Sequence, residues 1–139
     1  KKQMKDNEFY YGFDSEKQKQ YEKDLIKEGV VNQKFMDKYK EKINKWTQQD
    51  KDSFIQEGGD INRALISAIN KKLKPSSNEV QAIIRRHHAW VGWNPNREGY
   101  IGLSQRYRTP EFKKFYDHLH PELLDFIVEA MKIFAEREL

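Results

Sequence analysis

Apolar side chains recur at intervals of three and four residues along most of this chain, and this spacing constrains the fold more than any other feature. Between positions 80 and 91, for example, Val80, Ile84, His87 and Val91 fall on one side of a helical wheel. Such spacing is typical of an amphipathic α-helix with one face on a core. No stretch of four or more residues alternates polar and apolar positions between turns, as a surface strand requires. The pattern therefore predicts an all-α fold.

Three helices are expected in the first half of the chain. The first covers residues 15–28, and Asn32 is placed to begin the second. Thr47, with Asp50 three residues later, is suited to begin a third helix that extends to Leu73. The second helix carries its apolar residues at Phe35, Met36, Tyr39, Ile43 and Trp46.

Two glycines, Gly58 and Gly59, interrupt the third helix at a cost of roughly 1 kcal/mol each relative to alanine. The apolar phase nevertheless continues across them, because Phe54 and Ile61 are seven residues apart. We therefore expect a single helix, bent or frayed at the glycines. The alternative is two helices, with Asp60 capping the second.

Helix signals continue in the second half. Ser76 stands three residues before Glu79, which is the spacing of a capping box for a fourth helix, and residues 94–96 (Asn-Pro-Asn) end that helix. Three further helices are expected, over residues 100–107, from Thr109-Pro110, and from Pro121. The whole is interpreted as a compact bundle of about five main helices and one or two short ones.

Several kinds of chemistry are excluded by residue type. The chain has no Cys, so a disulfide, a thiolate nucleophile and a zinc site built on Cys are ruled out. His87 and His88 are adjacent and cannot face the same way on a helix, and His118 and His120 lie at an expected helix end. Nucleophile elbows, glycine-rich phosphate loops and His-Glu-x-x-His are missing from the sequence. We expect no metal, no cofactor and no enzymatic activity.

The four imidazoles are best interpreted as surface or hydrogen-bonded core histidines. The alternative is that one of them lines a ligand pocket, and His87 is then favoured because it shares the apolar face of its helix. No run of about 18 apolar residues is present, and no apolar stretch follows the N-terminal lysines. These two features favour a cytoplasmic protein without a membrane span.

Charge is unevenly distributed. Thirteen of the 19 lysines lie in residues 1–51, whereas the net charge of the chain is only +4. Residues 1–46 are polar and poor in aliphatic side chains, so we expect a helical N-terminal segment that acts as a mobile lid and is the least protected part of the protein without ligand. Residues 47–139 carry the dense apolar stripes and are expected to form the ligand-binding core.

Aromatic and arginine side chains concentrate between residues 85 and 116. One interpretation places the rings in the core and the arginines at its rim. In the other, Trp90 and Trp93, three residues apart beside a loop, form with Tyr100 the walls of a cleft for a large, flat ligand. Basic residues between rings also suit single-stranded nucleic acid, although the nearly balanced charge argues against it. The candidate ligand-binding residues are His87, Trp90, Trp93, Tyr100, Tyr107, Phe112, Tyr116, Phe35, Tyr39 and Trp46.

Short motifs in the second half occur in a characteristic order. They are Ser77-Asn78-Glu79-Val80-Gln81, Trp93-Asn94-Pro95, Tyr100-x-x-Leu103, Arg106-Tyr107, Thr109-Pro110-Glu111-Phe112 and Pro121-Glu122-Leu123-Leu124. In this order and spacing the chain resembles the TipAS antibiotic-recognition domain. The likeness extends over nearly the whole chain, and residues 76–135 are its distinctive part.

This resemblance implies a globin-like, all-α domain that binds large, flat or macrocyclic antibiotics such as thiopeptides. In that family the domain commonly follows a MerR-type DNA-binding domain and coiled coil, so a homodimer that activates transcription is implied, with DNA bound only through the preceding domain. The missing initiator Met and the lysine-rich opening favour this arrangement. Stand-alone members sequester drugs, and a stand-alone module that binds drugs or nucleic acid is the alternative.

Two departures from the family pattern affect the expected binding. The frequent Trp-Gly near the second helix is here Glu28-Gly29, so one aromatic wall is missing or rebuilt. The Cys to which some members attach thiopeptides has no counterpart, so binding to this chain is expected to be reversible.

Overall fold

The computed structural model describes residues 33–139, apart from the side chains of residues 33, 35 and 36. This part of the chain forms six helices and no strand: α2 (Gln33–Asn44), α3 (Gln48–Asn70), α4 (Asn78–Val91), α5 (Arg97–Arg106), α6 (Pro110–Leu119) and α7 (Leu123–Glu138). The prediction of a compact all-α fold is confirmed. The helix expected over residues 15–28 and the cap expected at Asn32 lie outside the described residues.

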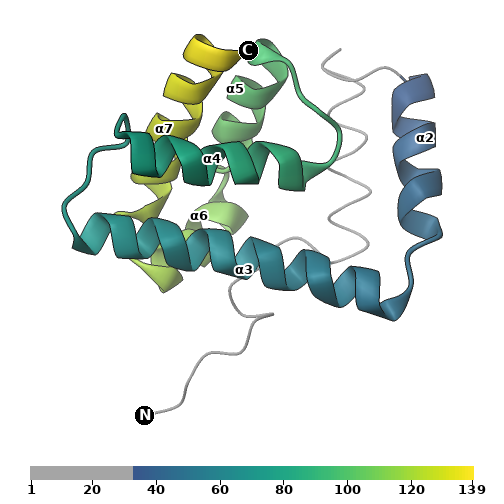
Figure 1. The fold of residues 1–139 in the computed structure, drawn as a ribbon, viewed down its shortest axis with the longest axis horizontal. Helices are drawn as coiled ribbons and strands as arrows, with labels where there is room; N and C mark the ends of the chain where they lie inside the picture. The colour runs from purple at the N-terminus through teal and green to yellow at the C-terminus, as the bar shows by residue number, and fades with distance from the viewer. Residues whose placement is uncertain (1–32) are drawn as a thin grey trace.

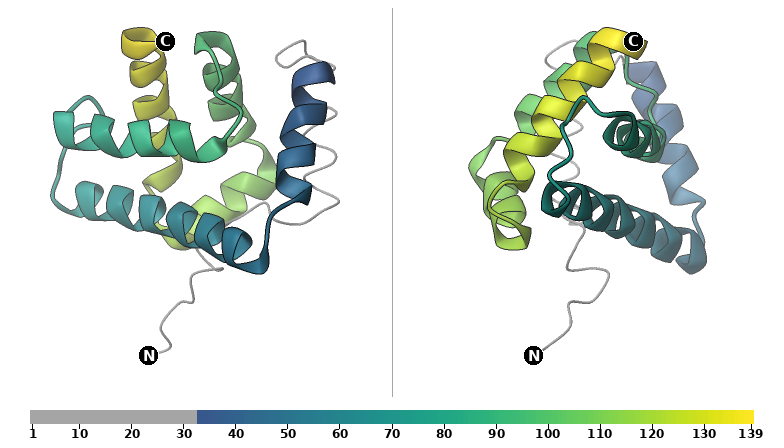
Figure 2. Two further views of the ribbon diagram at one scale, coloured as in Figure 1. Left: turned by 45° about the vertical axis from the view of Figure 1, so that its right-hand side comes forward. Right: turned by 60° about the vertical axis from the view of Figure 1, so that its left-hand side comes forward.

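Helix α7 is the centre of the bundle. It contacts α3, α4, α5 and α6, and α3 also packs along α4 (Figure 1). The turned views show α5 and α7 side by side, with α2 standing near the N-terminal end of α3 (Figure 2). Eight residues of α7 are buried: Leu123, Leu124, Ile127, Val128, Ala130, Met131, Phe134 and Ala135. Because each fully buried large apolar side chain contributes about 1.5–3 kcal/mol, α7 provides much of the stability of the core.

The capping box predicted at the start of α3 is confirmed. Thr47 Oγ1 accepts a hydrogen bond from the Asp50 N–H at 3.1 Å, and Asp50 Oδ2 accepts one from the Thr47 N–H at 2.9 Å. Two backbone donors that the helix leaves without a partner are satisfied in this way. The helix then continues without a break through Gly58 and Gly59, both buried, so the single-helix interpretation holds and the two-helix alternative is wrong.

The capping box predicted for α4 is wrong by one residue. The N-cap is Ser77 rather than Ser76, and its Oγ accepts a hydrogen bond from the Val80 N–H at 3.3 Å. Since the helix begins at Asn78, Glu79 occupies the second helical position and cannot complete a box. Helix α4 ends before Gly92, whose φ of 84° is a left-handed conformation that favours glycine.

Two later boundaries also differ from the expected ones. Helix α5 begins at Arg97 rather than near Tyr100, because Asn96 caps it by accepting a hydrogen bond from the Gly99 N–H at 2.8 Å. Helix α6 begins at Pro110 as predicted, whereas α7 begins at Leu123, two residues after Pro121. These shifts leave the assignment of each segment as a helix unchanged.

Candidate functional site

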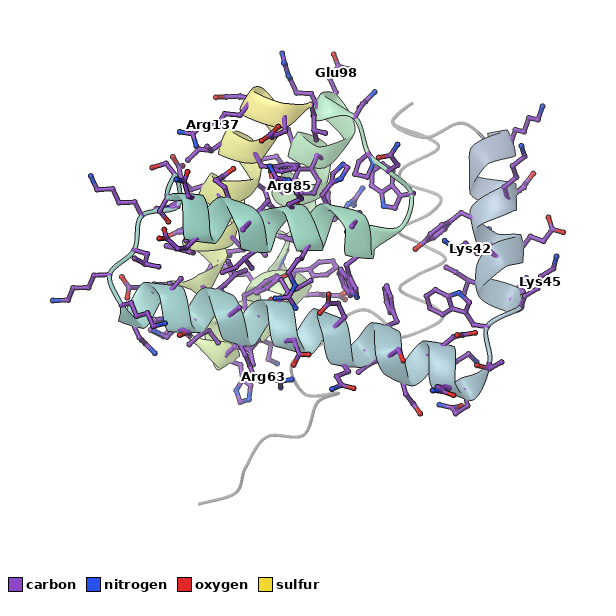
Figure 3. The ribbon with its side chains drawn as sticks, viewed as in Figure 1. Lys42, Lys45, Arg63, Arg85, Glu98 and Arg137 are labelled. Carbon is purple, nitrogen blue, oxygen red and sulfur yellow. The ribbon has the colours of Figure 1, made fainter. Side chains whose placement is uncertain are left out.

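A small pocket opens between α3, α4 and α6, and Tyr107, the residue after α5, also lines it. Its volume is about 20 Å³, which is enough for one water-sized group. The described residues that line it are Gly58, Ile61, Asn62, His87, Trp90, Tyr107, Phe112, Phe115 and Tyr116. Side chains otherwise fill the space between α3 and α4 (Figure 3).

His87 lies at the centre of this site. It belongs to the inward face of α4 and is 2% exposed. Its Nδ1 lies 2.7 Å from the Tyr100 hydroxyl, and its Nε2 lies 3.0 Å from the Tyr107 hydroxyl. Burial, with a smaller contribution from the neighbouring His88, lowers the pKa of His87 to about 3. The imidazole is therefore neutral at physiological pH, with one ring nitrogen as donor and the other as acceptor.

The tyrosines around His87 are held in their protonated form. Burial raises the pKa of Tyr107 above its usual range, against the opposing effect of a hydrogen bond with the Tyr116 hydroxyl. Burial also raises the pKa of Tyr100, and the nearby Tyr107 adds to the shift. The described lining carries no carboxylate, ammonium or guanidinium group. These described residues consequently offer hydrogen bonds and aromatic faces and carry no net charge.

A row of aromatic rings leads from the pocket toward α2. The rings of Trp90 and Phe54 are stacked with centroids 4.5 Å apart, and Trp46 follows at 5.1 Å from Phe54. On the pocket side, the Trp90 ring lies 5.7 Å from the His87 ring. Trp46, Phe54 and Trp90 are only partly buried, so this row of rings keeps some ring surface accessible. Such surface beside a pocket is suited to a flat ligand.

Residues 14–134 match the sequence profile of the TipAS antibiotic-recognition domain. The chain belongs to this family. It is also 35% identical over 138 residues to the HTH-type transcriptional regulator SkgA of Caulobacter vibrioides, in strain NA1000 / CB15N and equally in strain ATCC 19089 / CIP 103742 / CB 15. The alignment covers 95% of this chain and 54% of SkgA, so the chain spans about half the length of these curated relatives. No solved structure matches the chain significantly.

Five of the ten candidate residues line the pocket of this TipAS domain: His87, Trp90, Tyr107, Phe112 and Tyr116. Two others lie in the core outside the pocket lining. Tyr100 is fully buried behind His87, and Trp93 is 6% exposed. Of the expected cleft walls, Trp90 is therefore the one that borders the pocket.

The three N-terminal candidates lie away from the pocket lining or outside the described side chains. The Tyr39 hydroxyl donates a hydrogen bond to the Val91 carbonyl at 3.0 Å, which joins α2 to the end of α4. Trp46 lies just beyond α2 and packs on Phe54. Phe35 belongs to α2, and its side chain is outside the described part of the structure.

Four lining residues of the TipAS pocket were not among the candidates: Gly58, Ile61, Asn62 and Phe115. The sequence of α3 contains a pattern that indicates this part of the pocket. Gly58 and Asn62 are four residues apart on its otherwise apolar face, and both are buried. A small residue and a polar residue at this spacing on a buried helix face indicate that the face borders a pocket rather than packed apolar side chains.

Within residues 33–139, no group of three or more His, Cys, Asp or Glu side chains is arranged to hold a metal ion. In the same residues no helix has both the length and the apolar character needed to cross a bilayer.

Proposed function

We propose that this TipAS domain is the ligand-sensing effector domain of a transcription regulator. It binds a large, flat or macrocyclic antibiotic of the thiopeptide kind, and it acts through a MerR-type DNA-binding domain that precedes it in a cytoplasmic homodimer. The family match supports the ligand class. The name of SkgA as an HTH-type transcriptional regulator, together with the 54% coverage, supports an additional DNA-binding part.

The observation that carries this proposal is the aromatic pocket around His87, whose described lining residues carry no charge and which continues into the row of rings formed by Trp90, Phe54 and Trp46. A space of about 20 Å³ accepts only a small group of a large ligand. The remainder of the ligand then lies over the partly exposed rings outside. Binding is reversible because the sequence offers no Cys for attachment.

A titration with a thiopeptide tests the proposal. Trp90 borders the pocket, so its fluorescence is expected to change on binding, with a dissociation constant of about 1 µM or lower. Ligand at 100 times that constant is expected to stabilise the fold by about 2.7 kcal/mol, which appears as a higher melting temperature. If saturating thiopeptides change neither signal, the proposed ligand class is wrong.

A matched pair of phenylalanines separates binding from stability. Phe112 lines the pocket, whereas Phe126 is a partly buried ring of α7 that does not. Phe112→Ala is expected to weaken thiopeptide binding by about 1–3 kcal/mol. Phe126→Ala is expected to lower the melting temperature and leave the affinity within about twofold.

Binding of this chain to nucleic acid is the competing function. Its 26 basic residues are nearly matched by 22 acidic ones, and several arginines are held by carboxylates: Arg85 by Glu138, Arg86 by Glu57 and Arg108 by Asp125. The isolated chain is therefore expected to bind duplex or single-stranded DNA weakly at physiological salt. A gel shift with a sub-micromolar dissociation constant would favour the nucleic-acid module instead.

A further inference from the structure

The two halves of α3 differ in how deeply they are buried. Between residues 48 and 57, the outer half, every side chain is exposed or only partly buried. The buried residues all belong to the inner half, residues 58–70, and they are Gly58, Gly59, Ile61, Asn62, Leu65 and Ala68. Figure 1 shows the outer half extending beyond α4 toward α2. Because few apolar contacts are buried in the outer half, its attachment to the core is expected to be weak.

Two contacts hold the outer half against α4. The Trp90 ring stacks on Phe54 with centroids 4.5 Å apart, and the indole N–H donates a hydrogen bond to the Phe54 carbonyl at 2.8 Å. Arg86 forms an ion pair with Glu57 at 2.6 Å, in which the two side chains are 46% and 40% exposed. Ion pairs as exposed as this one contribute little, so the second contact is easily broken.

Gly58 and Gly59 stand at the junction of the two halves. Glycine favours a helix less than any residue except proline. The Phe54 carbonyl, which accepts the indole N–H, is also the helical acceptor for the N–H of Gly58 four residues later. Helices kink at pairs of small residues and where a side chain bonds into the ladder of backbone hydrogen bonds. Both features meet at this one turn of α3.

The outer half has stabilising contacts of its own at its far end. Its capping box satisfies the N–H groups of Thr47 and Asp50, and the Gln48 amide donates a hydrogen bond to Asp52 Oδ1 at 2.9 Å. These contacts oppose fraying from the N-terminal end. The outer half is therefore expected to move as an intact piece of helix.

From these observations we infer that α3 bends at Gly58 and Gly59, and that its outer half swings away from α4 to open the pocket for a ligand. The inference rests on the proposed ligand-binding function and names the entrance to that site. Gly58 and Trp90 both line the pocket, so a motion that separates α3 from Trp90 widens it. The closed space of about 20 Å³ holds one water-sized group, and any larger group enters only after this motion.

Hydrogen exchange in the full chain without ligand tests the bend. The bonds that open are those that cross the glycines, from the N–H groups of residues 58–61 to the carbonyls of residues 54–57. After correction for intrinsic exchange rates, the protection of residues 58–61 is expected to be at least about tenfold lower than that of residues 53–57 and 63–68. Protection that rises steadily from residue 52 to residue 68 indicates fraying and overturns the inference.

Two neighbouring arginines provide a matched pair of variants. Arg86→Gln removes the ion pair with Glu57, so the protection of residues 58–61 is expected to fall about two- to threefold. Arg85→Gln removes the ion pair with Glu138, which joins α4 to α7 at 2.8 Å, and is expected to leave that protection unchanged. An equal effect of the two variants overturns the inference.

A cross-link tests whether the outer half moves relative to α4. The chain has no Cys, so an introduced pair reacts alone. In Glu57→Cys/Arg86→Cys, a bismaleimide that spans the length of the ion pair is expected to raise the protection of residues 58–61 at least about fivefold. The same bridge in Arg85→Cys/Glu138→Cys is the control and is expected to leave it unchanged.

A bridge between α3 and α4 that leaves the protection of residues 58–61 unchanged overturns the inference, because the outer half then does not move relative to α4. All three measurements are made without a ligand. A failed thiopeptide titration therefore removes the proposed function, whereas a failed exchange experiment removes the bend, and the two failures can be told apart.

Discussion

The indole of Trp90 lies flat on the ring of Phe54, with planes 12° apart, and its N–H donates a hydrogen bond to the Phe54 backbone carbonyl at 2.8 Å. Phe54 is inside α3, so its carbonyl is also in position to accept the N–H of Gly58 four residues later. A side chain at position 58 would point back toward the turn that contains Phe54. Gly58 lines the pocket together with Trp90.

The contact between Trp90 and Phe54 combines a ring stack with a hydrogen bond, and two variants separate them. Trp90→Phe keeps a ring but loses the donor, so the free energy of unfolding is expected to fall by about 1 kcal/mol. Trp90→Ala loses both and is expected to cost about 3 kcal/mol, at the low end for a large aromatic because Trp90 is partly exposed. Urea denaturation followed by circular dichroism measures both. Equal losses in the two variants would show that the ring stack contributes little.

The stability of the domain is expected to fall with acid because of His87. The folded protein holds the pKa of His87 at about 3, whereas the unfolded chain has the ordinary value of 6.5. Between these values the unfolded state binds the extra proton, so stability rises with pH through this window and is lost as pH falls. Each pH unit below 6.5 is expected to cost about 1.4 kcal/mol, or about 2 kcal/mol at pH 5.

His87→Gln provides the control for this pH dependence. The variant lacks the titrating group, so its unfolding free energy is expected to change less between pH 7 and pH 5. The other three histidines and the carboxylates are present in both proteins and cancel in the comparison. A loss of the same size in wild type and variant would assign the acid sensitivity to those other groups.

Alanine substitutions at two glycines are expected to change the stability of the protein in opposite directions. A Cβ added at Gly102 in α5 would meet nothing within 4 Å, so Gly102→Ala is expected to stabilise the protein by up to about 1 kcal/mol through helix propensity. At Gly92 the φ of 84° disfavours any side chain, and a Cβ would lie 3.0 Å from Tyr39 Cε2. Gly92→Ala is expected to cost about 1–2 kcal/mol. Thermal unfolding of both variants measures the sign of each stability change. Stabilisation by Gly92→Ala would contradict the structure.

Tyr39 is expected to control how firmly α2 is attached. Among the described side chains of α2 it is the one that packs against the core, and its hydroxyl donates to the Val91 carbonyl. Tyr39→Phe keeps the ring and loses this bond, so the α2 amides are expected to exchange about fivefold faster, with the first half of α4 unchanged. Lys38→Ala, at an exposed position of α2, is the control. Exchange that increases equally in α2 and α4 would mean that the bond supports the whole fold rather than α2.

Local signals predicted those parts of the fold that depend on neighbours in sequence. The Thr47 capping box needs only Thr47, Asp50 and the first turn of α3, so its spacing was sufficient. The start of α4 was different because Ser76 and Ser77 are both able to cap. Contacts of Gln81 favour the second serine: its amide donates to the nearby Pro75 carbonyl at 2.8 Å and to the Ala130 carbonyl of α7 at 3.2 Å. The second of these bonds depends on α7, because Ala130 lies 49 residues away in the chain.

By itself the sequence determined that the chain is helical, that it belongs with TipAS domains, and that it carries no thiol, since spacing and residue type hold that information. Only the tertiary structure decided which rings border the pocket. Trp90 and Trp93 are three residues apart, and the left-handed turn at Gly92 between them directs Trp93 into the core while Trp90 stays on α3. The partners of His87 were also decided by packing, because Tyr100 and Tyr107 reach it only once α5 is folded back against α4. Helical spacing places side chains on the faces of one helix, whereas contacts between helices depend on how the whole core fills its volume.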